Sequence, residues 1–467
     1  MKRVAIVGGG ISGLSAAYAL EKIKRSIRGI DYLLLEASPR LGGVMVSERV
    51  DGCLIEAGPD SFLTEKPWAT QLCRELGIGD QIIGSNDEQR RTYILVRGRL
   101  VELPDGLMFM VPTKIVPTVL SPLFSVGTKL RMAREFFMPP APTTGDESVA
   151  AMVERHFGRE MVERLADPLL SGIYGADSAS LSARSVLPRF VELETKYGSL
   201  SRGMLVARKR MAQAMKGRPK PPLFSSLKNG MQQLVDALVA NLESERIRTN
   251  TAVDKVFWSG HDWELSVGNA KMNFDAVVFA TPAHVAARLL AGAHAEIASE
   301  LAGISYSSSI TTTLIYDRAA LAGRDRGFGF LVPRSEKRRM LACTFVHNKF
   351  PHRAPADRGI VRGFLGGLRD ENVMQMGDSE VLETLMRELR EITGIKAEPR
   401  AARIYRWSRS MAQPSPGHLE RMSRIEALRA QLPGLALAGN AYSGIGVPDC
   451  VRTGTEAANE LAKQLFG

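Results

Sequence analysis

The sequence predicts an α/β protein with a discontinuous parallel-sheet domain, a mixed β-sheet domain and a helical insertion. Three observations predict this fold. Residues 3–35 read as strand, helix and strand, with a glycine-rich turn after the first strand. Residues 435–465 contain a second glycine-rich turn that leads into a helix. The chain between them alternates between helical and strand-like hydrophobic spacing.

The N-terminal segment carries a dinucleotide-binding fingerprint. Val4–Val7 and Ile30–Leu35 are apolar runs typical of buried strands, and Ile11–Lys24 has helical spacing. Glycines in the first turn permit a tight bend, close approach of a pyrophosphate and close helix–strand packing, while an acid after the second strand binds ribose hydroxyls. The residues predicted to bind the nucleotide here are Gly8, Gly9, Gly10, Ile11, Ser12, Gly13, Glu36 and Ala37.

A second glycine block follows this fingerprint. Arg40, Gly42 and Gly43 come directly after the acid, and the run Gly58-Pro59-Asp60-Ser61 follows a further apolar stretch. This arrangement resembles the flavin amine-oxidase superfamily, in which an R-x-G-G segment lines the pyrophosphate and the flavin. The resemblance implies a Rossmann-like FAD-binding domain of the GR2 type, and it favours FAD over NAD.

Later segments complete this domain according to the same resemblance. Leu435–Ala438 is a predicted strand that is followed by Gly439 and Asn440. Gly446, Val447 and Pro448 then lead into a helix through Glu456–Leu465. In the superfamily, the corresponding helix points at the flavin. Phe274–Ala280 is predicted as an internal strand and Leu227–Asn241 as a helix. Strands within Ile247–Val256 are expected to place Val253 near the adenine.

The predicted domain ranges follow from these segments. The FAD-binding domain takes residues 1–88, 222–300 and 405–467, and the mixed-sheet substrate domain takes 89–104 and 301–404. Residues 105–221 form the helical insertion, with helices expected at Val149–Phe157, Met161–Leu165 and Val191–Met215. Tyr93–Val96 and Leu100–Leu103 are predicted to form a hairpin in the substrate domain.

Three stretches resemble the protoporphyrinogen/coproporphyrinogen oxidases within the superfamily. These are Gly58–Leu63, Asp167–Gly175 with its continuation to Ser182, and Gly446–Cys450. The resemblance implies oxygen-dependent removal of six electrons from a porphyrinogen in three FAD cycles, with hydrogen peroxide as the by-product. Cys450 falls inside the final helix, so the FAD is expected to be noncovalent. The sequence leaves protoporphyrinogen IX and coproporphyrinogen III undecided, and an amine oxidase or a polyene desaturase is the alternative.

Few residues suggest catalytic or substrate-binding roles. Asp60 is the candidate for steering the substrate or relaying a proton, although it also suits a turn cap after Pro59. Trp407 resembles a flavin-adjacent aromatic of the family, with core packing as the alternative. The substrate propionates need cations, for which Lys66, Arg91 and Arg97 are candidates, and an ordinary surface charge is the alternative for each.

Composition and charge exclude several classes. Hydrophobic residues make up 45% and charged residues 24%, which is ordinary globular usage. Four Cys without a CxxC pair and seven scattered His predict neither a disulfide scaffold nor a metal site.

The formal charge is +11, and the basic run Arg202–Pro222 contains no aromatic residue, which argues against nucleic-acid binding. No apolar stretch is long enough to span a membrane. We expect a cytoplasmic enzyme that contacts the inner face of the cell membrane peripherally, through Leu107–Val126 and the basic run. The sequence leaves a homodimer open.

Overall fold

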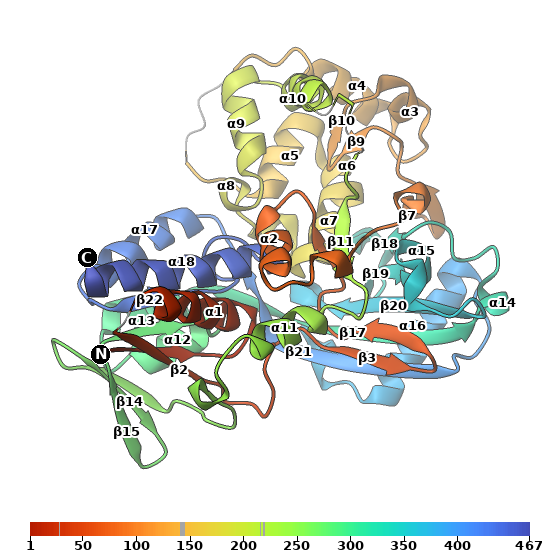
Figure 1. Ribbon diagram of the computed structural model, residues 1–467. Coiled ribbons are helices and arrows are strands. Elements are labelled where there is room, and N and C mark those ends of the chain that lie inside the picture. The colour runs from red at the N-terminus through yellow and green to blue at the C-terminus, as the bar shows by residue number, and fades with distance from the viewer. Residues whose placement is uncertain (28, 141–144, 215, 218–219) are drawn as a thin grey trace.

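The computed structural model describes residues 1–27, 29–140, 145–214, 216–217 and 220–467. Three parts are visible in Figure 1. A nucleotide-binding part holds both chain termini, a sheet-based part lies beside it, and a helical part stands above the junction between them. No helix in the described ranges is long and apolar enough to cross a membrane.

A five-stranded parallel sheet forms the centre of the nucleotide-binding part. Its strand order is β12-β2-β1-β16-β22, so strands from both ends of the chain lie in one sheet. All six residues of β2 are buried, which explains why the strand reads as a continuous apolar run. The strands are β1 (Lys2–Val7), β2 (Ile30–Leu35), β12 (Ile247–Arg248), β16 (Ala276–Phe279) and β22 (Leu435–Leu437).

Helices α1 (Ile11–Ser26) and α18 (Val447–Phe466) lie side by side on this sheet (Figure 1). Their approach is close because α18 carries glycine at the contact: a Cβ on Gly454 would stand 2.1 Å from the Ser12 carbonyl oxygen. The other helices of this part are α2 (Pro67–Glu75), α11 (Gln232–Ala240), α12 (Ala283–Leu290), α13 (Ala295–Ala302) and α17 (His418–Arg429).

Small antiparallel units complete the nucleotide-binding part. The expected helix Leu227–Asn241 is shorter, because Phe224–Leu227 pairs as strand β11 and the helix begins at Gln232. The remaining strands are β5 (Phe62–Leu63), β6 (Ile82–Gly84), β13 (Lys255–Trp258), β14 (Trp263–Val267) and β15 (Ala270–Phe274). The hairpin of β3 (Ser47–Val50) and β4 (Cys53–Glu56) packs on the mixed sheet (Figure 1).

The second part contains a seven-stranded mixed sheet with the order β21-β17-β20-β19-β18-β7-β8. Strand β21 spans Ala401–Gln413 and pairs with β17 along most of its length, so it runs across the boundary predicted at residue 404. The predicted hairpin forms as β7 (Thr92–Val96) and β8 (Arg99–Glu102). The other elements are β17 (Ser305–Asp317), α14 (Arg318–Leu321), β18 (Gly329–Leu331), β19 (Met340–Phe345), α15 (Val346–Lys349), β20 (Arg358–Gly366) and α16 (Asp378–Thr393).

The helical part matches the expected insertion, with one prominent break. The predicted helix Val191–Met215 divides at Gly198, whose φ of +73° ends α9; a Cβ there would stand 2.1 Å from the Pro139 carbonyl carbon. Residues Val162–Ala166 form a π-helical turn within the expected Met161–Leu165 helix. The elements are β9 (Leu107–Met108), β10 (Val111–Pro112), α3 (Ile115–Leu120), α4 (Val126–Glu135), α5 (Val149–Phe157), α6 (Arg159–Met161), α7 (Asp167–Tyr174), α8 (Ala183–Val186), α9 (Pro188–Tyr197) and α10 (Leu200–Ala214).

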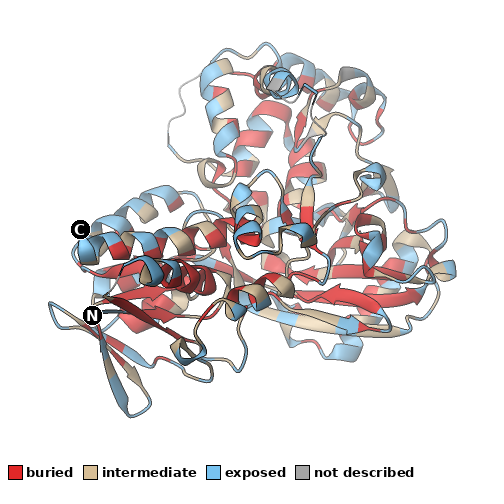
Figure 2. Ribbon diagram, viewed as in Figure 1, coloured by how far each residue is buried: buried red, intermediate tan, exposed pale blue. Residues whose placement is uncertain are grey.

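Burial follows these three parts. Figure 2 shows buried residues along both sheets and along the inner faces of the helices. The nucleotide-binding part has apolar clusters on both faces of its sheet, and the helical part has a core of its own that includes Ile94 of β7. The helical part is thus anchored on the edge of the mixed sheet.

Candidate functional site

The glycine turn between β1 and α1 has the geometry that a bound dinucleotide requires. Gly8 has a φ of +107°, and its N–H donates to the Leu35 carbonyl oxygen at 2.9 Å. A Cβ on Gly13 would stand 1.9 Å from the Gly8 carbonyl oxygen, so glycine is needed there for packing. A Cβ on Gly10 would meet no atom of the described residues within 4 Å. The Gly10 position therefore faces open space at the N-terminus of α1, where a phosphate is stabilised by the helix dipole and backbone N–H groups.

Glu36 lies at the carboxyl end of β2, beside this turn. Its carboxylate accepts hydrogen bonds from the backbone N–H groups of Gly9 (2.6 Å) and Ser38 (2.8 Å). Its carbonyl oxygen accepts from the N–H of Thr251 at 2.8 Å, which brings the segment containing buried Val253 next to the acid. A carboxylate oxygen accepts more than one hydrogen bond, so Glu36 retains capacity for ribose hydroxyls.

The second glycine block packs directly on the first. The Gly42 N–H donates to the Gly9 carbonyl oxygen at 2.8 Å, and Gly42 forms an isolated bridge with Gly10. Arg40 folds back, and its guanidinium donates to the carbonyl oxygens of Leu41 (3.1 Å) and Gly43. The block therefore forms a second wall in front of Gly10.

The segment 56–61 is held by a buried group of charged side chains. Lys349 Nζ lies 3.1 Å from both carboxylate oxygens of Asp60, and Arg353 Nη1 lies 3.0 Å from Glu56 Oε1. Arg362 donates to the Ala57 carbonyl oxygen at 3.3 Å and to that of Gly58. All three cations come from residues 349–362 of the mixed-sheet part. They therefore link this part to the nucleotide-binding part at the predicted flavin-facing segment.

This environment keeps Asp60 ionised. Burial alone would raise the pKa of Asp60, but the charges of Lys349, Arg362 and Arg353 outweigh burial and hold that pKa well below its usual range. Ser61 Oγ also donates to the carboxylate at 2.7 Å. A carboxylate held in this way takes up no proton near neutral pH. Asp60 is therefore better suited to anchoring the segment 58–61 than to relaying a proton.

The C-terminal glycine turn reaches the same region. Gly446 caps α18 and donates its N–H to Asp449 Oδ2 at 3.1 Å. Lys66 Nζ donates to both oxygens of Asp449, at 2.8 and 2.6 Å, which joins the segment after Asp60 to the start of α18. An ammonium has three donors, so one remains for a further partner.

Further predicted residues cluster around the same segment. Trp407 donates from Nε1 to the Ala57 carbonyl oxygen at 2.9 Å. Asn440 donates to the Ser410 carbonyl oxygen at 2.9 Å, and the neighbouring Gly439 N–H donates to Thr453 Oγ1 at 3.2 Å. A Cβ on Gly58 would stand 2.0 Å from the Val44 carbonyl oxygen, so this close backbone approach also requires glycine.

These groups fit a dinucleotide with a flavin. The open space at Gly10 and the spare hydrogen-bonding capacity of Glu36 suit a pyrophosphate and a ribose, and the start of α18 offers a second helix N-terminus. Cys450 is buried in α18, where burial raises the pKa of its thiol to about 12.

Two predicted residues lie apart from this group. Arg97 is exposed at the hairpin turn, where its backbone N–H and that of Gly98 donate to Glu336. Arg91 lines a separate polar pocket beside α15. Within the described ranges, no recorded hydrogen bond or ion pair connects either side chain to another predicted site residue.

Sequence reasoning missed Lys349, Arg353 and Arg362. They lie in the stretch Lys349-Phe350-Pro351-His352-Arg353 and in the middle of β20, and neither stretch matches a ligand-binding motif. An arginine inside an otherwise apolar strand was the one available signal, because such a charge is buried only when it is paired.

Comparisons with known proteins agree with this geometry. Residues 11–462 match the family described as flavin containing amine oxidoreductase. The chain is 34% identical to coproporphyrinogen III oxidase of Bacillus subtilis, covering 100% of this chain and 99% of that protein. It is 32% identical to coproporphyrinogen III oxidase of Staphylococcus aureus, covering 99% and 100% respectively.

Solved structures share the fold. A protein of Exiguobacterium sp. 255-15, described as a candidate protoporphyrinogen oxidase, superposes with a TM-score of 0.87 at 31% identity, covering 100% of this chain and 99% of that one. Cyclohexylamine oxidase of Brevibacterium oxydans superposes with a TM-score of 0.70 at 18% identity, with full coverage of both chains, and shows the fold alone. The chain belongs to the flavin containing amine oxidoreductase family, in the group that includes the bacterial coproporphyrinogen III oxidases.

Proposed function

We propose that this protein is an FAD-dependent oxidase that converts a porphyrinogen to the corresponding porphyrin in haem biosynthesis. The full-length similarity to bacterial coproporphyrinogen III oxidases carries the proposal. The glycine turn, Glu36 and the start of α18 support a noncovalent FAD, because they suit its pyrophosphate, its ribose and its ring system, respectively.

Coproporphyrinogen III is the substrate that we propose. Full-length relatives at 32–34% identity are named coproporphyrinogen III oxidases, whereas the chloroplastic protoporphyrinogen oxidase of Nicotiana tabacum is 28% identical. Coproporphyrinogen III carries four propionates where protoporphyrinogen IX carries two. The formal charge of +11 suits the more anionic of the two substrates.

Forming a porphyrin from a porphyrinogen removes six hydrogen atoms, which corresponds to three two-electron oxidations. Bound FAD supplies this two-electron chemistry, with oxygen as the final acceptor. The chain itself has to bind and orient the macrocycle. Asp60 holds the segment 58–61 in place, and Lys66 offers its third N–H to a substrate propionate. Lys66, Arg91 and Arg97 are the three predicted partners of the substrate propionates. Of these, Lys66 lies next to the segment 58–61, so we assign propionate binding to Lys66.

The decisive experiment is an assay of purified protein with each porphyrinogen, followed by porphyrin fluorescence and hydrogen peroxide. We expect coproporphyrin III to form faster than protoporphyrin IX, with about three peroxide molecules per porphyrin. Faster turnover of protoporphyrinogen IX would reverse the substrate assignment. A protein that oxidises a primary amine or a polyene, and neither porphyrinogen, would overturn the proposal.

We further propose that the enzyme is cytoplasmic and contacts an anionic membrane surface through its helical part. Val116, Val119 and Leu120 of α3 and Val126 and Leu130 of α4 are between 52% and 77% exposed. This surface differs from the predicted stretch Leu107–Val126, in which Met110, Val111, Leu123 and Phe124 are buried in the core. The basic run Arg202–Pro222 begins on α10 of the same part, and its residues 215, 218 and 219 lie outside the described residues.

A further inference from the structure

A polar pocket lies in the mixed-sheet part, apart from the candidate site. It has a volume of about 380 Å³ and is lined by the segment 86–91, the loop before β18, and the helix α15. Arg91 is the single residue that this lining shares with the predicted site residues. The pocket is therefore separate from the glycine turns and from the buried charges around Asp60.

The lining of the pocket carries excess positive charge. Three guanidinium groups, those of Arg91, Arg318 and Arg326, surround one carboxylate, that of Asp325. The Asp325 carboxylate is already paired, because Arg318 contacts its Oδ2 and His347 Nε2 lies 2.8 Å from the same oxygen. The charges of Arg91 and Arg326 are thus left uncompensated by Asp325.

These two arginines are held in neighbouring positions by a close backbone contact. Gly327 has a φ of +65°, and a Cβ there would stand 2.3 Å from the Arg91 carbonyl oxygen. The N–H of Phe328 donates to that same oxygen at 2.8 Å. Asn348 Nδ2 also donates to the Gly327 carbonyl oxygen at 2.9 Å. The loop that carries Arg326 is therefore fixed against Arg91 before any ligand arrives, which lowers the entropy cost of binding.

The side chains of the two arginines remain accessible. Both residues are exposed, and the hydrogen bond recorded for the Arg326 guanidinium is a long one of 3.4 Å from Nε to the Gly323 carbonyl oxygen. Arg91 interacts with the Tyr93 hydroxyl, an interaction that leaves most of its five N–H donors for other groups. Amide side chains of Asn86 and Gln89 complete the rim with further donors. Paired guanidinium groups with neutral donors around them are the arrangement that binds phosphate and carboxylate oxygens.

We propose that this pocket binds a small anion with two or more negative charges, of the phosphate-ester or polycarboxylate class, through Arg91 and Arg326. This site goes beyond the porphyrinogen oxidase activity and does not depend on it. The pocket and the candidate site are nevertheless connected, because α15 contributes residues to both. His347 and Asn348 of that helix line the pocket, whereas the next residue, Lys349, holds Asp60.

The test is calorimetric titration of the FAD-loaded protein at low ionic strength. Pyrophosphate and citrate are titrated in separate arms, with sodium chloride at matched ionic strength as the blank. We expect saturable binding of one ligand per chain in at least one arm. Binding of pyrophosphate alone would identify the phosphate class, binding of citrate alone the polycarboxylate class, and equal binding a general oxyanion site. A saturating ligand should also raise the melting temperature of the wild-type protein.

Variants assign the binding to the pocket. Arg91→Gln and Arg326→Gln should each weaken binding about ten-fold, the lower end of the range for losing a charged hydrogen bond. Arg324→Gln is the matched control, because Arg324 is an exposed arginine of the same loop that does not line the pocket. The absence of saturable heat in both arms would overturn the proposal. An equal loss in Arg324→Gln would do the same, because it would indicate nonspecific attraction.

Discussion

At the scale of single residues, the buried pair of Asp60 and Lys349 is the feature that most constrains the candidate site. Lys349 has 10% and Asp60 15% of its side chain exposed. Burial lowers the pKa of Lys349 and the pair opposes that shift, so each charge depends on the other. The pair therefore fixes the position of the segment 58–61. Losing one partner should lower the free energy of unfolding strongly.

Replacing Lys349 alone should destabilise the protein strongly. Lys349→Met leaves Asp60 buried without its closest cation, which we expect to cost about 3 kcal/mol in the free energy of unfolding. The double variant Asp60→Asn with Lys349→Met should recover part of this loss, because it removes the carboxylate together with its closest cation. Urea unfolding measures both values. The exposed Lys396→Met is the control, with an expected change within about 0.5 kcal/mol. Equal losses in the single and double variants would contradict the pairing.

Gly10 offers a second residue-scale prediction. Its φ of −71° is accessible to any residue, and a Cβ there meets no atom of the described residues within 4 Å. Gly10→Val should therefore fold normally but block the space needed by the pyrophosphate, so that the protein is purified without flavin. The ratio of flavin to protein absorbance gives the result. Gly127→Val, on an exposed face of α4, is the control that should keep its flavin. Full flavin content in Gly10→Val would remove this loop from the cofactor site.

Sequence patterns predicted the local parts of the candidate site and did not predict its long-range parts. Glu36 and Gly10 were identifiable because the fingerprint places each at a fixed step from a strand and a helix. Lys349 and Arg353 belong to the site because β19 and α15 return to the segment 56–61, across almost 300 residues of sequence. Such a contact depends on how the domains pack, and no local spacing encodes it.

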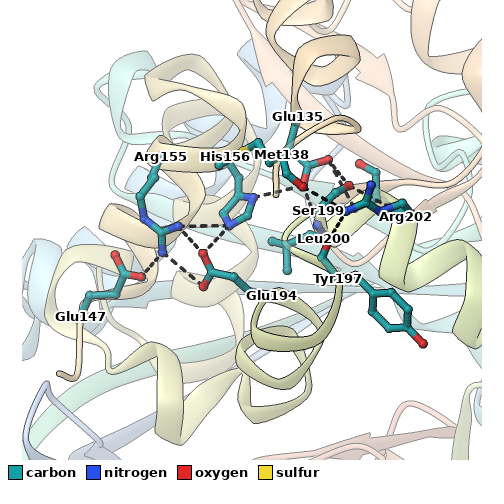
Figure 3. A network of polar contacts seen from close by, with 11 residues as sticks. Glu135, Met138, Glu147, Arg155, His156, Glu194, Tyr197, Ser199, Leu200 and Arg202 are labelled. Atoms are coloured by element: carbon teal, nitrogen blue, oxygen red, sulfur yellow. Dashed lines mark hydrogen bonds and ion pairs between the residues drawn. The ribbon is translucent and has the colours of Figure 1, made fainter. Parts of the chain in front are cut away.

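At the scale of elements, a buried network holds the helical part together (Figure 3). His156 of α5 is fully buried between two carboxylates: its Nδ1 lies 3.1 Å from Glu135 of α4, and its Nε2 lies 3.0 Å from Glu194 of α9. Glu135 also accepts from the N–H of Leu200 at 2.5 Å and so caps α10. Through Glu135 and Glu194, His156 of α5 is therefore linked to α4, α9 and α10, and α4 carries part of the exposed apolar surface.

This network predicts a pH dependence of stability. Burial would lower the pKa of His156, but the hydrogen bonds that Glu135 and Glu194 accept from it outweigh burial and raise that pKa. A raised pKa means that the stabilisation by His156 is complete below about pH 6.5 and is lost as the pH rises through the folded-state pKa. The two glutamates behave in the opposite sense. Their pKa values are lowered despite burial, that of Glu194 to about 2, so their contribution is present above about pH 4.5 and is lost in acid.

Urea unfolding between pH 5.5 and 10 measures this contribution. We expect the free energy of unfolding to fall on the alkaline side in the wild-type protein, and the fall to be smaller in His156→Gln. His261→Gln is the control, because that side chain is 82% exposed. An identical pH profile for wild-type protein and His156→Gln would show that His156 does not titrate with folding.

At the scale of the whole molecule, the chain passes through the nucleotide-binding part three times. The resemblance to the flavin amine-oxidase superfamily predicted this discontinuity, and β16 and β22 do join β1 in one sheet. The extent of β21 was not predictable in this way. Its thirteen residues are mostly exposed or half-buried and carry little apolar signal, and the strand is defined by its pairing with β17.

The surface of the whole molecule leads to a prediction about membranes. Val116, Val119 and Leu120 follow helical spacing on α3, as do Val126 and Leu130 on α4, and all five point outward. Apolar side chains of this kind give only marginal membrane binding unless basic residues add attraction to anionic lipid, at about 1 kcal/mol each.

Flotation with liposomes tests this face. We expect the protein to float with vesicles that contain anionic lipid at low salt, to bind neutral vesicles weakly, and to dissociate at high salt because screening removes the basic contribution. The double variant Leu120→Ser with Leu130→Ser should reduce flotation several-fold, since it removes the two most exposed leucines of this face. Phe257→Ser is the matched control, because Phe257 is 55% exposed on β13 of the nucleotide-binding part. If the wild-type protein stays with the unbound fraction at low salt, or if the control loses as much binding as the double variant, then this face does not attach to membranes and its apolar side chains require another partner.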